Sequence, residues 1–366
     1  MSLHPGPLAA AAPAASLFPP RATDIPYRPG LDGLRALSCL VVVFFHCWAP
    51  FAGGGFVGVD VFFVISGYLI TTMLAGEAAR GGIRVGRFYA RRAVRLYPTL
   101  LLLVVAYLAL APVLWPADRQ WLYAGLAAFY LTDYSLGHFG QPLIVGHSWS
   151  LAVEEKFYLL WPLVLPFVLR ARRPVAWLVA AFVAATAWRC FTAVQWGWPQ
   201  AYFTFDARLS GLMLGAIAAV ARPKVSGTAA FVAAVALAAV IAVPTLPSLP
   251  FHRTLEATTL VITMAELSAF LLVCRAAQPG AGGLLAWPPL TYVGRLSYGI
   301  YLWHFPAVVL LRDVQPLWIT AAGTLLFAGA MAALCLHLVD EPLRRWRQKR
   351  WPKERTDLTA SRLPAR

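Results

Sequence analysis

The sequence consists mainly of apolar runs of about twenty residues that alternate with short, arginine-rich connections. A helix of about twenty apolar residues matches the thickness of the hydrocarbon core of a lipid bilayer. Apolar residues make up 60% of the 366-residue chain and charged residues only 13%, whereas soluble domains carry about 25% charged residues. The pattern therefore predicts a multi-pass helical membrane protein. It excludes a water-soluble enzyme and a disordered chain.

The predicted fold is all-α and polytopic, with about ten transmembrane helices and both termini cytoplasmic. The orientation follows from Lys and Arg placement, because cationic loops stay on the cytoplasmic side of the inner membrane. With ten spans, every basic cluster falls on that side. A further apolar piece at 121–130 is too short to span. The predicted spans are 31–50, 57–74, 96–114, 149–169, 175–193, 205–220, 227–243, 255–273, 292–311 and 317–339.

Three regions divide the chain: a disordered Pro/Ala-rich cytoplasmic tail at 1–28, a membrane domain at 29–342 and a basic cytoplasmic tail at 343–366. The 31 Lys and Arg residues against 16 acids give a net charge of +15. In a membrane protein this excess is explained by anionic lipid, so the bilayer rather than a nucleic acid is the expected partner. The five cysteines lie singly in apolar runs, so neither a disulfide framework nor a metal site is expected.

The first predicted span contains two polar side chains, Arg35 and His46. They are eleven positions apart, which places them on one helical face, about 16 Å apart along the axis. A charge inside a span costs about 2.5–3.5 kcal/mol on insertion scales, so it indicates a function or a partner. One interpretation is a polar track along this face. The alternative is that Arg35 reaches back to the inner surface and His46 lies at the outer interface.

Carboxylates also occur inside the predicted spans. Asp60 follows the glycine-rich sequence that opens the second span, and it is either a functional group or the partner of His46 or of an arginine. Asp206 and Arg208 are expected to pair with each other. Each of these predictions follows from the cost of leaving a buried charge without a partner.

Glu154 and Glu155 are adjacent near the outer end of the span at 149–169. Lys156 follows them directly and is expected to pair with one of the two carboxylates. The other would remain free to orient or charge a histidine.

Two further patterns place polar groups on helical faces. Ser297, Tyr301 and His304 have the spacing i, i+4, i+7 and share one face, where His304 is either a packing residue or part of a site. Arg92 and Arg95 are three residues apart at the inner surface. Guanidinium groups bind phosphate bidentately, so the ligand is either a lipid headgroup or a phosphorylated cofactor.

Together these blocks resemble the acyltransferase-3 family of integral-membrane O-acyltransferases, over about residues 27–345. The departure from the family pattern is Lys156, where an uncharged Gln is usual. The blocks that carry the resemblance are Leu31-Asp32-Gly33-Leu34-Arg35 with His46, Gly58-Val59-Asp60-Val61-Phe62-Phe63-Val64-Ile65-Ser66-Gly67, Arg92-x-x-Arg95, Trp149-Ser150-Leu151-x-x-Glu154-Glu155, and Ser297-Tyr298-Gly299-Ile300-Tyr301-Leu302-Trp303-His304.

The resemblance implies transfer of an acyl group, usually acetyl, from cytoplasmic acyl-CoA to a hydroxyl of a cell-envelope carbohydrate or related compound. Acyl-CoA is then a co-substrate, and we expect no permanently bound cofactor and no metal. Some relatives carry an additional esterase-like domain. We expect any such extracytoplasmic partner of this chain to be a separate polypeptide.

The expected mechanism starts from neutral His46 as the general base, with Glu154 or Asp60 stabilising the imidazolium. Arg35 would stabilise the oxyanion, and an acyl-His46 or acyl-Cys47 relay remains an alternative. The predicted catalytic residues are His46, Arg35, Glu154, Asp60 and Glu155; the donor-binding residues are Arg92, Arg95, Ser66 and Gly67; and the acceptor-binding residues are His147, Trp149, Tyr301 and His304.

A second function class fits the same residues. A proton-coupled transporter or flippase of a glycolipid or small metabolite also uses intramembrane His, Asp and Glu side chains. Transport moves a substrate unchanged, whereas acyl transfer makes a base-labile ester and frees CoA.

Overall fold

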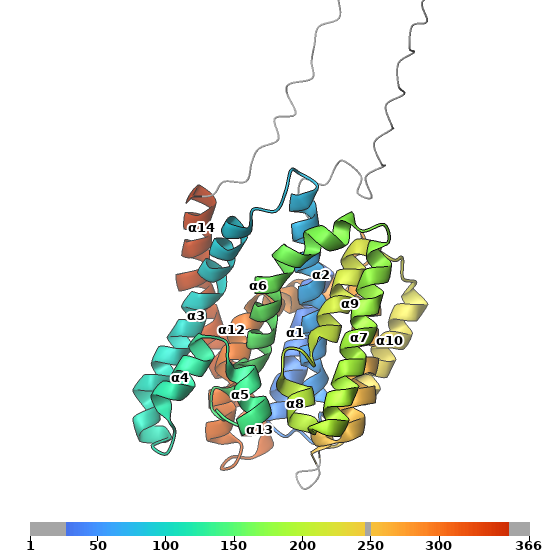
Figure 1. The fold of residues 1–366 in the computed structure, drawn as a ribbon. Coiled ribbons are helices and arrows are strands. Elements are labelled where there is room, and N and C mark those ends of the chain that lie inside the picture. The colour runs from blue at the N-terminus through green and yellow to red at the C-terminus, as the bar shows by residue number, and fades with distance from the viewer. Residues whose placement is uncertain (1–26, 246–249, 351–366) are drawn as a thin grey trace, which may run out of the picture.

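Each of the ten predicted apolar segments contains a helix in the computed structural model, which describes residues 27–245 and 250–350 (Figure 1). These residues form helices and no strands, so the predicted all-α class is confirmed. The predicted tail at 1–28 lies almost entirely outside the described residues. The ten helices are α1 (Pro29–His46), α2 (Gly58–Ala78), α3 (Val85–Leu114), α6 (Trp149–Arg170), α7 (Pro174–Gln195), α9 (Leu209–Ala221), α10 (Gly227–Ile241), α11 (Ile262–Ala276), α12 (Pro288–Leu311) and α13 (Leu317–Cys335).

Six of the described helices are long and apolar enough to cross a membrane, namely those that contain α1, α2, α3, α7, α11 and α13. α9 and α10 are shorter, with 13 and 15 residues. In α6 and α12, polar side chains interrupt the apolar run. The structure therefore supports a multi-pass membrane protein with six candidate spans.

Short helices cover both ends of the bundle. α4 (Gln120–Ala128), α5 (Thr132–Phe139) and α8 (Trp198–Phe203) lie at one end, and α14 (Glu341–Arg350) lies at the other beside the start of α3 (Figure 1). α4 matches the predicted non-spanning piece at 121–130. The prediction for α3 was wrong at its start, because the helix begins at Val85 and includes the arginines expected in a loop. Arginine is a good helix former, so it does not end a helix that leaves the membrane.

Glycines set the distances between the central helices. A Cβ atom on Gly67 of α2 would lie 2.1 Å from the carbonyl oxygen of Leu212 in α9. Likewise, a Cβ atom on Gly294 of α12 would lie 2.0 Å from the carbonyl oxygen of Asp32 in α1. Small residues let helix backbones approach in this way. The contact between α1 and α12 brings Arg35 and His46 against the polar face of α12.

The outside of the bundle is apolar. Large side chains such as Val113, Phe167 and Leu326 are 72–80% exposed, while two arginines, Arg189 and Arg208, are fully buried inside. This distribution is the reverse of that in a soluble protein. It fits a bundle whose outer surface faces lipid.

Candidate functional site

A cavity of about 450 Å³ lies inside the bundle, between α1, α2, α3, α6 and α12. The segment that joins α13 to α14, with the π-helix η6 (Leu336–Asp340), closes one side. The exposed side chains of Arg295 and Arg344 line the cavity at the end where α14 lies, so it opens to the surface there. The charged residues that line it are Arg35, Arg92, Arg95, Arg295, Arg344, Asp32, Glu154, Asp340 and Glu341.

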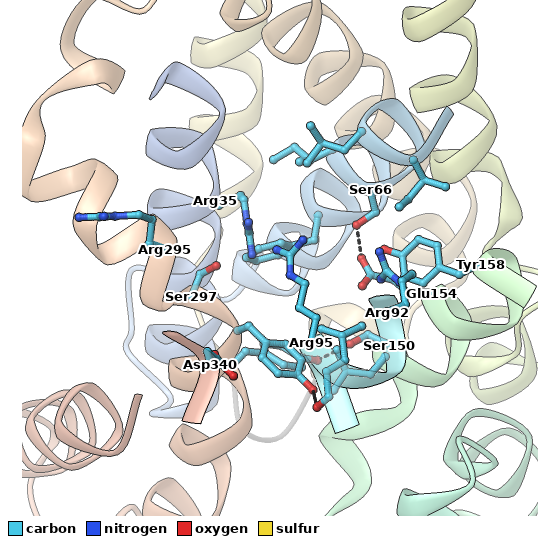
Figure 2. A pocket seen from close by; sticks show the side chains of 18 of the residues that line it. Arg35, Ser66, Arg92, Arg95, Ser150, Glu154, Tyr158, Arg295, Ser297 and Asp340 are labelled. Atoms are coloured by element: carbon cyan, nitrogen blue, oxygen red, sulfur yellow. Dashed lines mark hydrogen bonds between the residues drawn. The ribbon is translucent and has the colours of Figure 1, made fainter. Parts of the chain in front are cut away.

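Three of these arginines meet inside the cavity, Arg35 from α1 and Arg92 and Arg95 from α3 (Figure 2). The Arg92 guanidinium lies 3.3 Å from the centre of the Tyr158 ring and 3.3 Å from a Glu155 carboxylate oxygen. Its Nε–H is buried and donates to no partner among the described residues. Arg92 and Arg95, which the sequence grouped by their spacing of three residues, therefore line the same cavity.

Arg35 is held loosely. Its Nη1 lies 3.9 Å from a carboxylate oxygen of Asp32, and the Arg35 side chain is 17% exposed. Ser297 lines the same cavity from α12, and its Oγ is buried without a partner in the described part of the chain. An arginine and a serine hydroxyl with free hydrogen-bonding capacity are thus available to a ligand here.

The two adjacent glutamates have separate partners. Glu154 lines the cavity and accepts a 2.5 Å hydrogen bond from Ser66 (Figure 2), while Glu155 pairs with Arg92. The predicted pairing of Lys156 with a glutamate was wrong. Lys156 instead lies 2.7 Å from Asp133 of α5, because its position on α6 directs it to α5 and away from the cavity.

Tyr301 stands at the deep end of the cavity. Its hydroxyl donates a 2.8 Å hydrogen bond to the carbonyl oxygen of His147 and lies 2.7 Å from Ser150 Oγ. Ser150 and Tyr301 both line the cavity. Three histidines, His46, His147 and His304, lie beyond this point.

His46 and His304 form a hydrogen-bonded pair. His304 Nδ1 lies 2.6 Å from the carbonyl oxygen of Tyr301, and His304 Nε2 lies 3.1 Å from His46 Nδ1. A carbonyl only accepts, so Nδ1 of neutral His304 carries the proton and Nε2 accepts from His46. This tautomer leaves Nε2 of His46 with a free lone pair. The half-buried His46 therefore has a ring nitrogen that can act as a base.

The third histidine is part of the supporting structure. His147 Nε2 lies 3.0 Å from the carbonyl oxygen of Leu302, and its ring stacks on Phe305 at 5.1 Å. A fourth, His252, packs against Phe45 from a surface segment. Burial, together with the neighbouring Arg253, lowers the pKa of His252 to about 4, so it adds no charge near the histidine pair at neutral pH.

The predicted stabilisation of His46 by Glu154 or Asp60 was wrong. Glu154 is bound to Ser66, and Asp60 forms a 2.6 Å ion pair with Arg208 in which both side chains are fully buried. The group that contacts His46 is His304. The reason is helix rotation: Asp60 faces α9, whereas His46 faces α12.

The pairing of Arg208 with Asp60 also corrects the predicted Asp206–Arg208 pair. Asp206 instead accepts hydrogen bonds from Tyr134 and Trp188. Residues two apart at a helix start point in different directions. The alternative interpretation of Asp60, an interhelical partner of an arginine, is the one confirmed.

Two predicted binding residues have packing roles. Gly67, predicted to bind the donor, touches the α9 backbone and leaves no room for a ligand. Trp149, predicted to bind the acceptor, is buried between Tyr202 and Phe203, with ring centres 5.2 and 5.3 Å away. The glycine and the tryptophan shape the bundle and not the cavity surface.

One buried ion pair was missed from the sequence. Arg189 of α7 and Glu266 of α11 are fully buried with 3.0 Å between Nη1 and Oε1, and Ser210 donates to the same carboxylate oxygen. The signal was present, because each is a lone charge in a long apolar run. The cavity arginines Arg295 of α12 and Arg344 of α14 were also missed as site residues.

The chain matches the profile of the acyltransferase domain family Acyl_transf_3 over residues 28–339. YrhL of Bacillus subtilis, whose name proposes a peptidoglycan O-acetyltransferase, is 30% identical over 356 residues, which cover 87% of this chain and 55% of YrhL. The O-acetyltransferase OatA of Staphylococcus aureus is 31% identical, covering 87% and 57%. The peptidoglycan O-acetyltransferase OatA of Listeria monocytogenes is 28% identical, covering 87% and 56%.

The chain thus spans just over half the length of the curated relatives that it matches. No solved structure matches it. The family profile nevertheless covers most of the chain, from the start of α1 to the end of η6. The protein belongs to the acyltransferase-3 family.

Proposed function

We propose that this protein is a multi-pass enzyme of the inner membrane that moves an acetyl group from cytoplasmic acetyl-CoA to a hydroxyl of peptidoglycan or a similar envelope carbohydrate. The observation that carries the proposal is the arginine-lined cavity, which leads from one end of the bundle to Tyr301, next to a histidine pair with a free base. The names of the relatives support acetyl as the group and peptidoglycan as the acceptor.

The cavity opens at the arginine-rich end of the bundle, which the distribution of cationic residues assigns to the cytoplasm. Arg92 and Arg95 are suited to bind the phosphates of acetyl-CoA, because guanidinium groups bind phosphate oxygens in pairs. The pantetheine arm then extends past Arg35 and Ser297 toward Tyr301. In this arrangement the acyl group crosses the hydrophobic barrier and the nucleotide does not.

The reaction forms one ester bond and breaks one thioester bond. His46 Nε2 takes the proton from the acceptor hydroxyl, whose oxygen attacks the acetyl carbonyl carbon. The carbon–sulfur bond then breaks, and the CoA thiolate takes this proton from the His46 imidazolium, which frees CoA as a thiol and restores neutral His46. Arg35 lies about 16 Å from His46 along the axis of α1, too far to contact the reacting carbonyl, so its role is to bind the donor inside the cavity.

His304 holds His46 ready for this step. The chain of hydrogen bonds from the Tyr301 carbonyl through His304 to His46 fixes the His46 tautomer. The same chain replaces the carboxylate that orients the histidine in a Ser-His-Asp triad. Glu154, bound to Ser66, remains within the donor cavity, where its charge lies near the cavity arginines.

The test uses the full chain in proteoliposomes with radiolabelled acetyl-CoA on the arginine-rich side and a peptidoglycan oligosaccharide on the other. We expect a base-labile acetyl ester on the oligosaccharide and one free CoA thiol per ester. A transporter or flippase would move the saccharide and leave acetyl-CoA intact. Absence of CoA release with intact, inserted protein would refute acyl transfer.

A further inference from the structure

Tyr301 separates the donor cavity from the histidine pair. Its ring lies 6.5 Å from the Phe62 ring, which lines the cavity. The centre of the same ring lies 5.4 Å from that of His304 and 5.8 Å from that of His147. The Tyr301 side chain is only 6% exposed. An acyl group that moves from the level of Arg35 to His46 therefore has to pass this ring.

Two hydrogen bonds hold the ring in place. The Tyr301 hydroxyl donates to the carbonyl oxygen of His147, and Ser150 therefore donates to the Tyr301 oxygen. These bonds tie α12 to the start of α6, where Ser150 lies at the deep end of the cavity (Figure 2). Displacing the ring breaks both bonds inside the protein, where lost hydrogen bonds are costly.

The wall beside the ring is apolar and closely packed. Val59 and Phe62 of α2 and Leu151 of α6 line the cavity at this end, and Val59 and Leu151 are at least nine-tenths buried. Protein interiors are packed about as densely as organic crystals, so they accommodate extra methylene groups only by displacing side chains. A two-carbon acyl group needs little such displacement, and each further methylene needs more.

We propose that Tyr301 and Phe62 select the length of the transferred acyl chain, so that the enzyme uses acetyl donors and rejects longer ones. This inference rests on the proposed function and adds its donor specificity. The bonds formed and broken are the same for every acyl-CoA. The two rings decide only which acyl group reaches the acceptor hydroxyl.

The test compares acetyl-, propionyl-, butyryl- and hexanoyl-CoA with one oligosaccharide acceptor, using the full chain in proteoliposomes. Phe62→Ala makes space beside Tyr301 and leaves both of its hydrogen bonds intact. We expect the ratio of kcat/KM for butyryl-CoA to that for acetyl-CoA to rise at least about tenfold, since butyryl carries two more methylene groups and one methylene in an apolar pocket already changes kcat/KM about tenfold or more. Ser150→Ala loosens the ring and should raise the ratio less.

Leu69→Ala is the matched control. Leu69 lines the same cavity from the same helix, two turns nearer the open end. This variant should change the rates for acetyl and butyryl donors by the same factor. An equal rise of the ratio in Leu69→Ala and Phe62→Ala would mean general loosening of the cavity and would overturn the proposal.

The remaining outcomes separate the inference from the function beneath it. An unchanged ratio in an active Phe62→Ala enzyme removes the selective role of these rings and leaves acetyl transfer standing. If the unmodified protein makes no ester from any acyl-CoA, the proposed function fails and the inference fails with it. If Phe62→Ala does not assemble, the butyryl-to-acetyl ratio of kcat/KM is measured in Phe62→Leu and Ser150→Ala instead. A ratio that is unchanged in both variants contradicts the proposal.

Discussion

Two groups of charged side chains lie inside this bundle, and they differ in how closely they are paired. The pairs Arg208–Asp60 and Arg189–Glu266 have separations of 2.6 and 3.0 Å, and their four side chains are fully buried. In the cavity, Arg35 lies 3.9 Å from its carboxylate and is 17% exposed. We call the first group the closed pairs. The charged residues that line the cavity are the cavity charges.

The difference separates structural charges from functional ones. A closed pair satisfies its own charge and has no contact with a ligand, so its effect is on the stability and geometry of the bundle. The cavity charges are held at longer distances beside open space, so an anionic ligand can replace their present partners. Burial of a charge in a membrane helix alone does not distinguish these cases. The partner of the charge and the open space beside it distinguish a structural charge from a functional one.

The largest expected effect sharpens the functional side of this comparison. His46→Ala should lower the acetyl transfer rate by about 10²–10⁴, because it removes the general base, and it should reduce the free energy of unfolding by only about 1–3 kcal/mol, the cost of the lost hydrogen bond to His304. Ester formation by mass spectrometry and a melting curve in detergent measure the two quantities. Acetyl transfer at the original rate would exclude His46 from the mechanism.

The next effect concerns a closed pair. Arg208→Met should reduce the free energy of unfolding by about 3–5 kcal/mol, because it leaves Asp60 as a buried, uncompensated charge. The double variant Asp60→Leu and Arg208→Met should recover most of this loss, since it removes both charges. Unfolding in detergent measures both. If the single and double variants are equally unstable, the ion pair is not the cause.

A smaller effect is expected at a cavity charge. Arg92→Ala should weaken acetyl-CoA binding about ten- to hundredfold, the usual range for a lost charged hydrogen bond, with acceptor binding unchanged. Arg170→Ala is the matched control, because Arg170 lies at the same end of the bundle and outside the cavity. Calorimetry on the purified protein gives both affinities, and equal losses in the two variants would point to general surface charge.

The smallest effect is expected at a charge that belongs to neither group. Asp206→Asn should change stability by less than about 1 kcal/mol and leave activity unchanged, because the amide oxygen still accepts from the Trp188 N–H and the amide N–H can donate to the Tyr134 hydroxyl. Its partners Tyr134 and Trp188 are partly exposed. A large loss of activity in this variant would show that the division into closed pairs and cavity charges is incomplete.

Much of the fold could be predicted from the sequence, because bilayer thickness imposes a length on every apolar run. The helical segments, the short α4 and the shared face of Arg35 and His46 follow from hydropathy and helical period alone. The start of α3 was not predictable in this way, since arginines continue a helix beyond the membrane as readily as they form a loop.

The partners of the polar residues depended on tertiary structure. Hydropathy identifies Asp60, Glu154 and His46 as unusual, but helix rotation decides that they face Arg208, Ser66 and His304. Those rotations are set by backbone contacts at glycines such as Gly67 and Gly294. The sequence alone determined which residues need a partner, because the cost of a charge in lipid is local. Only the packed helices decided which partner each one has, because that depends on residues far apart in the chain.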